Sequence, residues 1–395
     1  MELLILKGAE LFSPAPAGIR DLLVGGGRIL SIAPEVSLSA QGIDVTQCDC
    51  RGLKALPGLI DGHVHIAGAG GEGGPATRTP EVTVSQLLRG GITSVIGCLG
   101  TDGYTRTPAS VLMKAKSLRA EGLSAWMLTG AYQIPPPTIT GDLGRDIAMI
   151  EEVVGVGEVA ISDHRASWMS PEALVDLASK ARVGGMIGGK SGIVQLHMGD
   201  VRDPLRPIYR ALEISAIPIQ QFMPTHMNRN AWIFEDAKEF GRRGGRIDIT
   251  TSSYRYFPDD ERKSSKALAE LLAAGVPLDR ITFSSDGNGS LPLFDAGGAL
   301  VRLEIGQPQT IFTEMVDAIV DEGVPIESAL AVVTRNPAHA FGLHGKGELV
   351  PGADADILLV DDHWQIRHVL CRGRFMVEDG VARRGTFEDL RSAEP

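Results

Sequence analysis

The chain has 395 residues, of which 43% are hydrophobic, and its formal net charge is −11 at pH 7. This length allows one large domain with a smaller one beside it, and the acidic balance without a Lys/Arg block argues against nucleic acid as a partner. No apolar run approaches the roughly 18–20 residues that a membrane helix needs, so we expect a soluble, cytoplasmic protein that does not bind membranes.

The two ends of the chain have the pattern of short strands separated by glycine-rich turns. Asp21–Val24 and Arg28–Ile32 flank the run Gly25–Gly27, which is typical of a β-hairpin. Near the other end, short apolar strands are expected at 355–360, 366–371 and 375–377. We predict that residues 1–56 and 346–395 together form one small β-sandwich domain.

Residues 57–345 alternate apolar strands with helical stretches. The expected strands are 59–66, 92–98, 124–130, 156–162, 193–198, 218–224, 246–250 and 280–285. The expected helices include 107–121, 171–182, 230–243, 262–274, 309–322 and 326–341. Eight strands in strand–helix alternation favour a parallel (β/α)8 TIM-like barrel over an open doubly wound sheet. In such barrels the chemistry lies at the C-terminal ends of the strands.

The first expected barrel strand ends in two histidines, within the run Pro57–His65. Because successive side chains of a strand alternate faces, His63 and His65 point the same way. Two imidazoles on one face suit a divalent metal such as zinc, although two hydrogen-bonded histidines in a loop are the simpler alternative. At this point the chain resembles the amidohydrolase superfamily of metal-dependent hydrolases, whose first barrel strand carries such a motif.

Three more candidate metal ligands follow at the ends of expected strands. His197 ends the fifth strand, His226 the sixth and Asp286 the eighth. Taken alone, each residue could have a purely structural role: a histidine at the end of a strand that hydrogen-bonds to the backbone, or an aspartate that caps a turn. On strands one, five, six and eight of one barrel, they resemble the ligand set of an amidohydrolase metal centre.

Longer strings resemble one family within this superfamily, the isoaspartyl dipeptidases, and they extend over nearly the whole chain. They are Gly70–Pro75, Arg78–Glu81, Gly100–Asp102, Thr129–Tyr132, Ile161–Arg165, Arg182–Gly185, His197–Asp200, Pro224–His226, Asn228–Asn230 and Ser284–Ser290. The resemblance implies a soluble hydrolase, expected to be a homo-oligomer, that cleaves small β-aspartyl dipeptides with two divalent metal ions, zinc being the expected metal.

A substrate of this class carries two carboxylates and one ammonium. Arg165 and Arg229 lie at strand–helix junctions where each can bind a carboxylate in a bidentate manner, the alternative being surface ion pairs. Glu72, in a glycine-rich loop, suits the ammonium; its alternative is a solvated carboxylate. The resemblance adds further substrate-binding residues, namely Gly70, Gly71, Thr101 and Ser290, and it implies that Tyr132 donates to the developing oxyanion.

The chain departs from the family on the fourth strand. Relatives carry there a lysine whose carbamate bridges the two metals, whereas this chain has Glu158, preceded by one extra residue near Gly157. We expect that a bulge turns Glu158 inward, so that its carboxylate bridges the metals; the alternative is a mononuclear centre. His63, His65 and Asp286 would then hold one ion, and His197 and His226 the other.

The expected reaction is attack on the amide carbon by a metal-bridging hydroxide, with Asp286 as general base and acid. Two further functions stay open. The chain resembles other amidohydrolases, such as N-acyl-amino-acid deacylases and cyclic-amide hydrolases, but Glu72 suits a free ammonium that an N-acylated substrate lacks. A non-enzymatic hydantoinase-like scaffold is less compatible with the retained histidines and aspartate.

Overall fold

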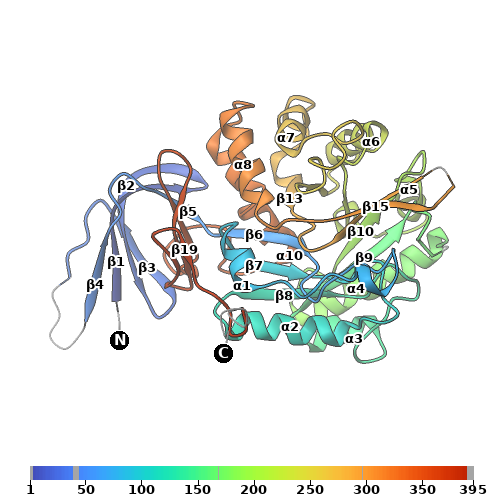
Figure 1. Ribbon diagram of the computed structural model, residues 1–395, viewed down its shortest axis with the longest axis horizontal. Helices are drawn as coiled ribbons and strands as arrows, with labels where there is room; N and C mark the ends of the chain where they lie inside the picture. Colours follow the sequence, from blue (N-terminus) through green and yellow to red (C-terminus); the bar gives the residue numbers. More distant parts are fainter. Residues whose placement is uncertain (1–2, 39–43, 168, 296, 389–395) are drawn as a thin grey trace.

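The structure is a computed structural model that describes residues 3–38, 44–167, 169–295 and 297–388. A β-sheet built from both ends of the chain lies beside a barrel of strands and helices (Figure 1). Residues 1–2, 39–43 and 389–395 of the predicted small domain lie outside the described residues. Among the helices described, none is long and apolar enough to cross a membrane.

The terminal sheet joins strands that are distant in sequence. Its strands are β1 (Leu3–Ser13), β2 (Ala15–Gly25), β3 (Arg28–Ala33), β4 (Val45–Asp49), β5 (Lys54–Pro57), β16 (Ile357–Val360), β17 (Ile366–Cys371), β18 (Arg374–Glu378) and β19 (Val381–Ala382). The order is β19-β18-β17-β16-β5-β1-β2-β3, and β4 also pairs with β1. The antiparallel pairing of β5 with β16 therefore unites the N- and C-terminal segments, as the sequence predicts.

The predicted N-terminal hairpin is confirmed as β2 and β3. Its turn is formed by Gly26 and Gly27, whose φ angles are 60° and 81°. Two consecutive residues with positive φ define the tight hairpin turn that only glycine adopts without steric cost. Behind this sheet, Leu6, Leu22 and Ile357 belong to an apolar cluster separate from the main core.

Eight parallel strands form the barrel. They are β6 (Leu59–Val64), β7 (Ile92–Gly97), β8 (Ser124–Thr129), β9 (Val153–Ile161), β10 (Ile193–Met198), β11 (Phe222–Thr225), β12 (Ile247–Thr250) and β13 (Ile281–Ser284). Strands β6 to β11 pair in sequence order, and β12 pairs with β13. The amide of Met227 donates to the Asp248 carbonyl (3.1 Å) and that of His65 to the Gly287 carbonyl (2.9 Å), which connects these two groups into a ring. The predicted barrel is confirmed.

The helices alternate with these strands. They are α1 (Val84–Leu88), α2 (Pro108–Ala120), α3 (Leu143–Met149), α4 (Pro171–Gly188), α5 (Arg206–Glu213), α6 (Ala231–Arg242), α7 (Ser264–Ala273), α8 (Thr310–Val320), α9 (Ile326–Ala331) and α10 (Arg335–Phe341). The single helix predicted over 326–341 is wrong, because α9 ends before Val332 and α10 begins at Arg335. Pro337 has no amide hydrogen and fits only a first helical turn, so the chain must start a new helix there.

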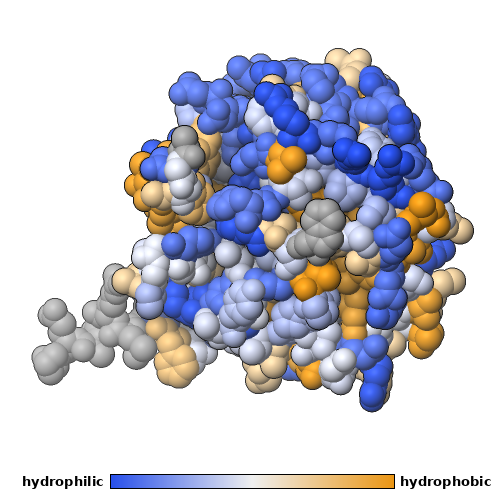
Figure 2. Space-filling model, turned by 90° about the vertical axis from the view of Figure 1, so that its right-hand side faces the viewer, coloured by the Kyte–Doolittle hydropathy of each residue, from blue (hydrophilic) through white to orange (hydrophobic). Residues whose placement is uncertain are grey.

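A second difference from prediction is an antiparallel hairpin after the last barrel strand, β14 (Ser290–Phe294) and β15 (Leu300–Ile305). It projects at the side of the barrel onto which Figure 2 looks. On that face hydrophilic residues predominate, and the hydrophobic residues form separate groups rather than one continuous surface (Figure 2). Similarly, the strand predicted at 218–224 begins with a short 3-10 helix, Ile219–Gln221, ahead of β11.

Candidate metal centre and active site

The first barrel strand delivers two buried histidines to the C-terminal mouth of the barrel. His63 lies in β6 and His65 directly after it, and both side chains are at most 5% exposed. Their Nε2 atoms lie 3.6 Å and 3.0 Å from Oδ1 of Asp286, which follows β13. Although burial opposes ionisation, the neighbouring imidazoles of His65 and His63 hold the pKa of Asp286 below its usual value. These three side chains form one donor group.

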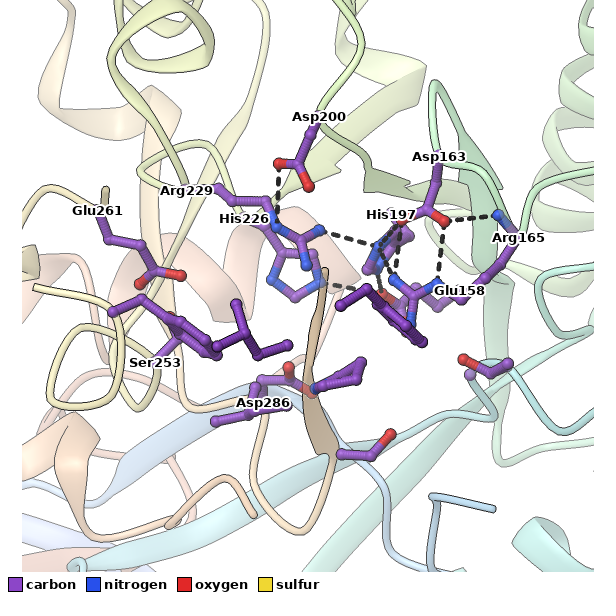
Figure 3. Close-up of a pocket in the computed structure, with 18 of the residues that line it drawn as sticks. Glu158, Asp163, Arg165, His197, Asp200, His226, Arg229, Ser253, Glu261 and Asp286 are labelled. Carbon is purple, nitrogen blue, oxygen red and sulfur yellow. Dashed lines mark hydrogen bonds and ion pairs between the residues drawn. The ribbon is translucent and has the colours of Figure 1, made fainter. Parts of the chain in front are cut away.

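Glu158 lies between this group and a second pair of histidines. Its Oε2 lies 3.3 Å from His63 Nε2 and 3.8 Å from His65 Nε2. Its Oε1 lies 2.5 Å from His197 Nδ1 and 3.0 Å from His226 Nε2 (Figure 3). Each carboxylate oxygen thus faces a different histidine pair.

The bulge predicted near Gly157 is present. Val156 pairs with Val194 of β10 and Val159 with Leu196, so two residues of β9 stand opposite Gln195 alone. An extra residue in one strand bends it and re-aims the side chains beside it. The bulge coincides with Glu158, whose carboxylate is 1% exposed and turned toward the four histidines.

The donor set fits divalent metal ions. Among the described residues, Nδ1 and Nε2 of His63, Nδ1 of His65 and Oδ1 of Asp286 are buried and have no well-directed hydrogen bond. Buried polar atoms are normally satisfied, so such a group needs another partner. Imidazole nitrogens and carboxylate oxygens are the donors that zinc takes in catalytic sites. Two groups of donor atoms lie within 4.8 Å of one another, one from His63, His65, Cys98 and Glu158 and the other from Glu158, His197 and His226.

His226 is oriented by a residue of the next strand. Its Nδ1 lies 2.7 Å from Oγ1 of Thr250, the last residue of β12, while its Nε2 faces Glu158. A partner at one ring nitrogen fixes the tautomer and leaves the other nitrogen free to ligate. His226 has a φ of 63°, in the left-handed region, so its backbone is also held in a conformation that few side chains adopt.

We expect Thr250→Val to weaken metal binding, because the valine keeps the volume but removes the hydroxyl that orients His226. The typical loss on removing such a supporting group is about 10–100-fold in metal affinity. Metal content after dialysis against graded chelator measures it. Thr313→Val, on the outer side of α8, serves as the control; equal metal retention by both variants would contradict this role of Thr250.

Tyr132 lies over the second histidine pair. Its hydroxyl is 2.7 Å from His197 Nδ1, and its side chain is buried near the start of the loop that follows β8. Burial and the negative charge of Glu158 raise the pKa of Tyr132 well above its usual value, so the phenol keeps its proton. A protonated hydroxyl at this position can donate to an oxyanion.

The two predicted arginines also converge on His197. Arg165 forms a two-pronged ion pair with Asp163, with distances of 2.9 Å and 2.8 Å, and its Nη2 is 3.4 Å from His197 Nε2. Arg229 has its Nη1 3.1 Å from the same nitrogen and its Nε 3.5 Å from Asp200 (Figure 3). Both guanidinium groups therefore border the centre, and neither is a surface ion pair far from it.

Glu72 is placed beside the cavity by Ser290. The Ser290 hydroxyl donates to Glu72 Oε1 (2.8 Å), and Arg165 Nη1 lies 3.8 Å from the same oxygen. The second oxygen, Oε2, is buried and has no hydrogen-bond partner among the described residues. Gly70 has a φ of 77°, and a Cβ on it would lie 2.4 Å from the Thr77 carbonyl oxygen, so this loop requires glycine there. Glu72 is thus not a solvated loop carboxylate.

A cavity of ≈ 330 Å³ opens over these groups. Thr101, Ser290 and both arginines line it, and the hairpin β14–β15 contributes Leu291 to Phe294 as an apolar wall. Of the predicted substrate-binding residues, Gly70, Gly71 and Glu72 are not among its lining residues, and Glu72 adjoins it through its bond to Ser290. His164 lines the cavity with its ring 4.9 Å from that of Phe294.

Some residues of the site were not predicted. Cys98, buried after β7, shares a possible ligand group with His63, His65 and Glu158. Asp163 lies 3.2 Å from His197 Nε2. Glu261 lines the cavity, and burial raises its pKa to about 7, partly offset by Ser253. Cys98 ends the predicted strand 92–98 and Asp163 belongs to the string Ile161–Arg165, so both carried a signal, whereas Glu261 lies in no predicted strand or quoted string.

Comparisons with known proteins agree with this geometry. A model of the amidohydrolase family matches residues 194–382. Imidazolonepropionase from Paracoccus denitrificans is 24% identical over 88% of each chain. A D-hydantoinase structure shares the fold, with a TM-score of 0.68, 18% identity and 97% of each chain covered.

A solved structure with higher identity is that of beta-aspartyl dipeptidase from the keratin-degrading thermophile Fervidobacterium islandicum AW-1, in complex with a beta-Asp-Leu dipeptide. It is 41% identical to this chain, and its TM-score is 0.90. The alignment covers 98% of this chain and 100% of the dipeptidase. Identity at this level over both whole chains exceeds what a shared fold alone explains. The chain is therefore a hydrolase that belongs to the beta-aspartyl dipeptidase family of the amidohydrolases.

Proposed function

We propose that this chain hydrolyses β-aspartyl dipeptides at a centre of two divalent ions, with zinc as the metal. The observation that carries the substrate is Glu72, which has one oxygen bound by Ser290 and the other buried without a partner. A buried carboxylate oxygen of this kind needs a donor, and the α-ammonium of a β-aspartyl residue supplies one. The 41% identical relative was solved with such a dipeptide.

The arginines complete recognition of a zwitterionic substrate. Arg165 and Arg229 border the cavity and offer planar guanidinium groups to its two carboxylates. Asp163 and Asp200 hold these guanidinium groups in place. Thr101 and Ser290 line the same cavity and bind the carboxylate end. A hydantoin or an N-acyl amino acid has no ammonium, so it would leave Glu72 Oε2 unpaired.

In the proposed centre His63, His65 and Asp286 would hold one ion and His197 and His226 the other, with the Glu158 carboxylate between the two groups. When bound, the ions supply Lewis acidity and an activated water. Asp286 accepts the proton of the attacking water and delivers it to the leaving amine. The Tyr132 hydroxyl donates to the oxyanion that develops on the former carbonyl oxygen.

We further propose the organisation around this site. The terminal sheet forms a β-sandwich domain of residues 1–56 and 346–395, and residues 57–345 form the catalytic barrel. The protein acts in the cytoplasm as a homo-oligomer. The separate small domain is supported by the apolar cluster of the terminal sheet, in which Leu6 and Leu359 are fully buried.

We expect Glu72→Gln to lower kcat/KM for β-Asp-Leu by on the order of 10²-fold, since the ammonium would lose its charged partner in a buried site. Metal content should stay at the wild-type level, because Glu72 contacts no metal ligand. The matched control is Glu81→Gln, a carboxylate on the same loop that pairs with Lys114 at 3.2 Å. Unchanged turnover in Glu72→Gln, or wild-type preference for N-acetyl-Asp over β-Asp-Leu, would contradict the proposal.

A further inference from the structure

A second cavity lies at the opposite end of the barrel from the metal centre. It has a volume of ≈ 590 Å³ and is lined by residues that precede β10, β11, β12 and β13, together with residues of α4 and α10. These residues are Arg182, Gly189, Lys190, Ser191, Pro218, Gln220, Gln221, Arg246, Arg280, His339, Ala340, Gly342 and His344. The N-terminal face of such barrels ordinarily serves stability, so a polar cavity there is unexpected.

The charge of this cavity is opposite to that of the whole chain. Three arginines and one lysine line it, and no described aspartate or glutamate does, although the chain carries a net charge of −11. A concave surface lined by one sign of charge concentrates ions of the other sign. The cavity is therefore a positive site on an acidic protein.

The cations differ in how their charge is used. The Lys190 ammonium donates to the carbonyls of Ile147 and Ile150, so it is occupied within the fold. Arg182 donates to the neutral amide of Gln221 (3.2 Å). Lys190 is thus occupied within the fold, whereas Arg182 uses only Nη1 for a neutral acceptor and keeps a charge that is uncompensated among the described residues.

Arg246 and Arg280 are less well compensated. Arg280 lies 3.4 Å from Asp279, which is 61% exposed. Arg246, although half-buried, has no hydrogen-bond or ion-pair partner within 3–38, 44–167, 169–295 and 297–388. A half-buried guanidinium without an acceptor is costly, since each of its donors has left water without replacement.

The strand register explains why these two arginines are neighbours. Ile247 of β12 pairs with Ile281 of β13, so the residues immediately before them, Arg246 and Arg280, stand at equivalent positions on adjacent strands. Like charges in such positions repel. Burial and the charge of Arg280 both lower the pKa of Arg246. An anion between the two side chains removes this repulsion.

We propose that this cavity binds a small anion of the phosphate class, held by Arg246, Arg280 and Arg182. Guanidinium groups match the tetrahedral oxygens of phosphate through paired N–H donors, and His339 and His344 offer further ring nitrogens at the rim. The volume admits a phosphate ester as well as inorganic phosphate. Because the site lies at the far end of the barrel, binding there does not compete with the dipeptide.

Calorimetric titration of the metal-loaded protein with inorganic phosphate at low salt tests the proposal. We expect Arg246→Gln to weaken binding by at least about tenfold, the size of one lost charge-assisted hydrogen bond, and Arg246→Lys to weaken it less. Arg280→Gln gives an independent variant should Arg246→Gln fail to fold. The control is Arg210→Gln, an exposed arginine of α5 that pairs with Glu213.

A second measurement, the inhibition of β-Asp-Leu hydrolysis by phosphate, distinguishes phosphate bound at the metal centre from phosphate bound in the second cavity. Such inhibition should be the same in wild type and in Arg246→Gln, whereas the calorimetric event at the cavity is lost. Equal phosphate affinity in wild type, Arg246→Gln and Arg280→Gln would overturn the site. Absence of any calorimetric binding by wild type at millimolar phosphate would overturn it too.

Discussion

Replacing Glu158 by alanine should remove metal from the centre and reduce hydrolysis by on the order of 10³-fold or more. The two oxygens of Glu158 face the two histidine pairs, at 3.3 Å from His63 and 2.5 Å from His197. Without Glu158 the second group keeps only two donors, His197 and His226, one fewer than the three protein ligands of a catalytic zinc site. An ion contributes several kcal/mol to such a reaction, and each 1.4 kcal/mol corresponds to a factor of ten.

Metal analysis and turnover on the same preparation measure this effect. Glu151→Gln, an exposed carboxylate just before β9, is the control and should keep both metal and activity.

Bicarbonate should not restore Glu158→Ala, nor change metal loading of the wild type, because a glutamate needs no reaction with carbon dioxide to act as a ligand. In a metal-loaded structure we expect Glu158 oxygens about 2.0–2.2 Å from ions that are about 3.5–4 Å apart. Bicarbonate-dependent reconstitution of the wild type would refute a glutamate bridge.

The second large effect is expected for Asp286→Asn. The asparagine keeps the shape of the side chain but cannot accept the proton of the attacking water, so kcat should fall by on the order of 10²-fold or more. Asp286 also lies 3.0 Å from His65, so partial loss of one metal is expected alongside. Steady-state kinetics at saturating metal distinguish the two effects.

Asp260→Asn is a suitable comparison. Asp260 is another aspartate that lines the same cavity, but its side chain is exposed rather than buried among the histidines. It should change KM more than kcat. Near-normal kcat in Asp286→Asn with full metal occupancy would show that another group accepts the proton.

The barrel was predictable because its strands are short apolar runs separated by helical stretches, and β10 agrees with prediction residue for residue. The hairpin β14–β15 was not. Its first strand contains Pro292, which lacks an amide hydrogen and weakens a strand pattern, so the segment after Asp286 carried no clear signal. The break between α9 and α10 had a signal in Pro337, but the apolar pattern across 326–341 concealed it.

The centre was predictable to the extent that strand ends define it. His63, His65, His197, His226 and Asp286 each lie near or just after the C-terminal end of an apolar strand, and parallel strands bring these ends to one face. The extra residue beside Gly157 indicated the bulge, which the β9–β10 register confirms. Cys98, at the end of the predicted strand 92–98, and Asp163, within the string Ile161–Arg165, stood at positions of the same kind, but nothing in the sequence singled them out as site residues. Glu261 lies on a loop without such a pattern.

The pairing of β5 with β16 has a consequence for synthesis of the protein. During translation, residues 1–57 leave the ribosome long before Ile357–Val360 exists, and at about 5–20 residues per second the delay is roughly 15–60 s. For that time β5 has a free edge, which in other proteins recruits foreign strands. The nascent chain is therefore vulnerable to aggregation until its last part emerges. Any fragment that stops short of β16 keeps this open edge permanently.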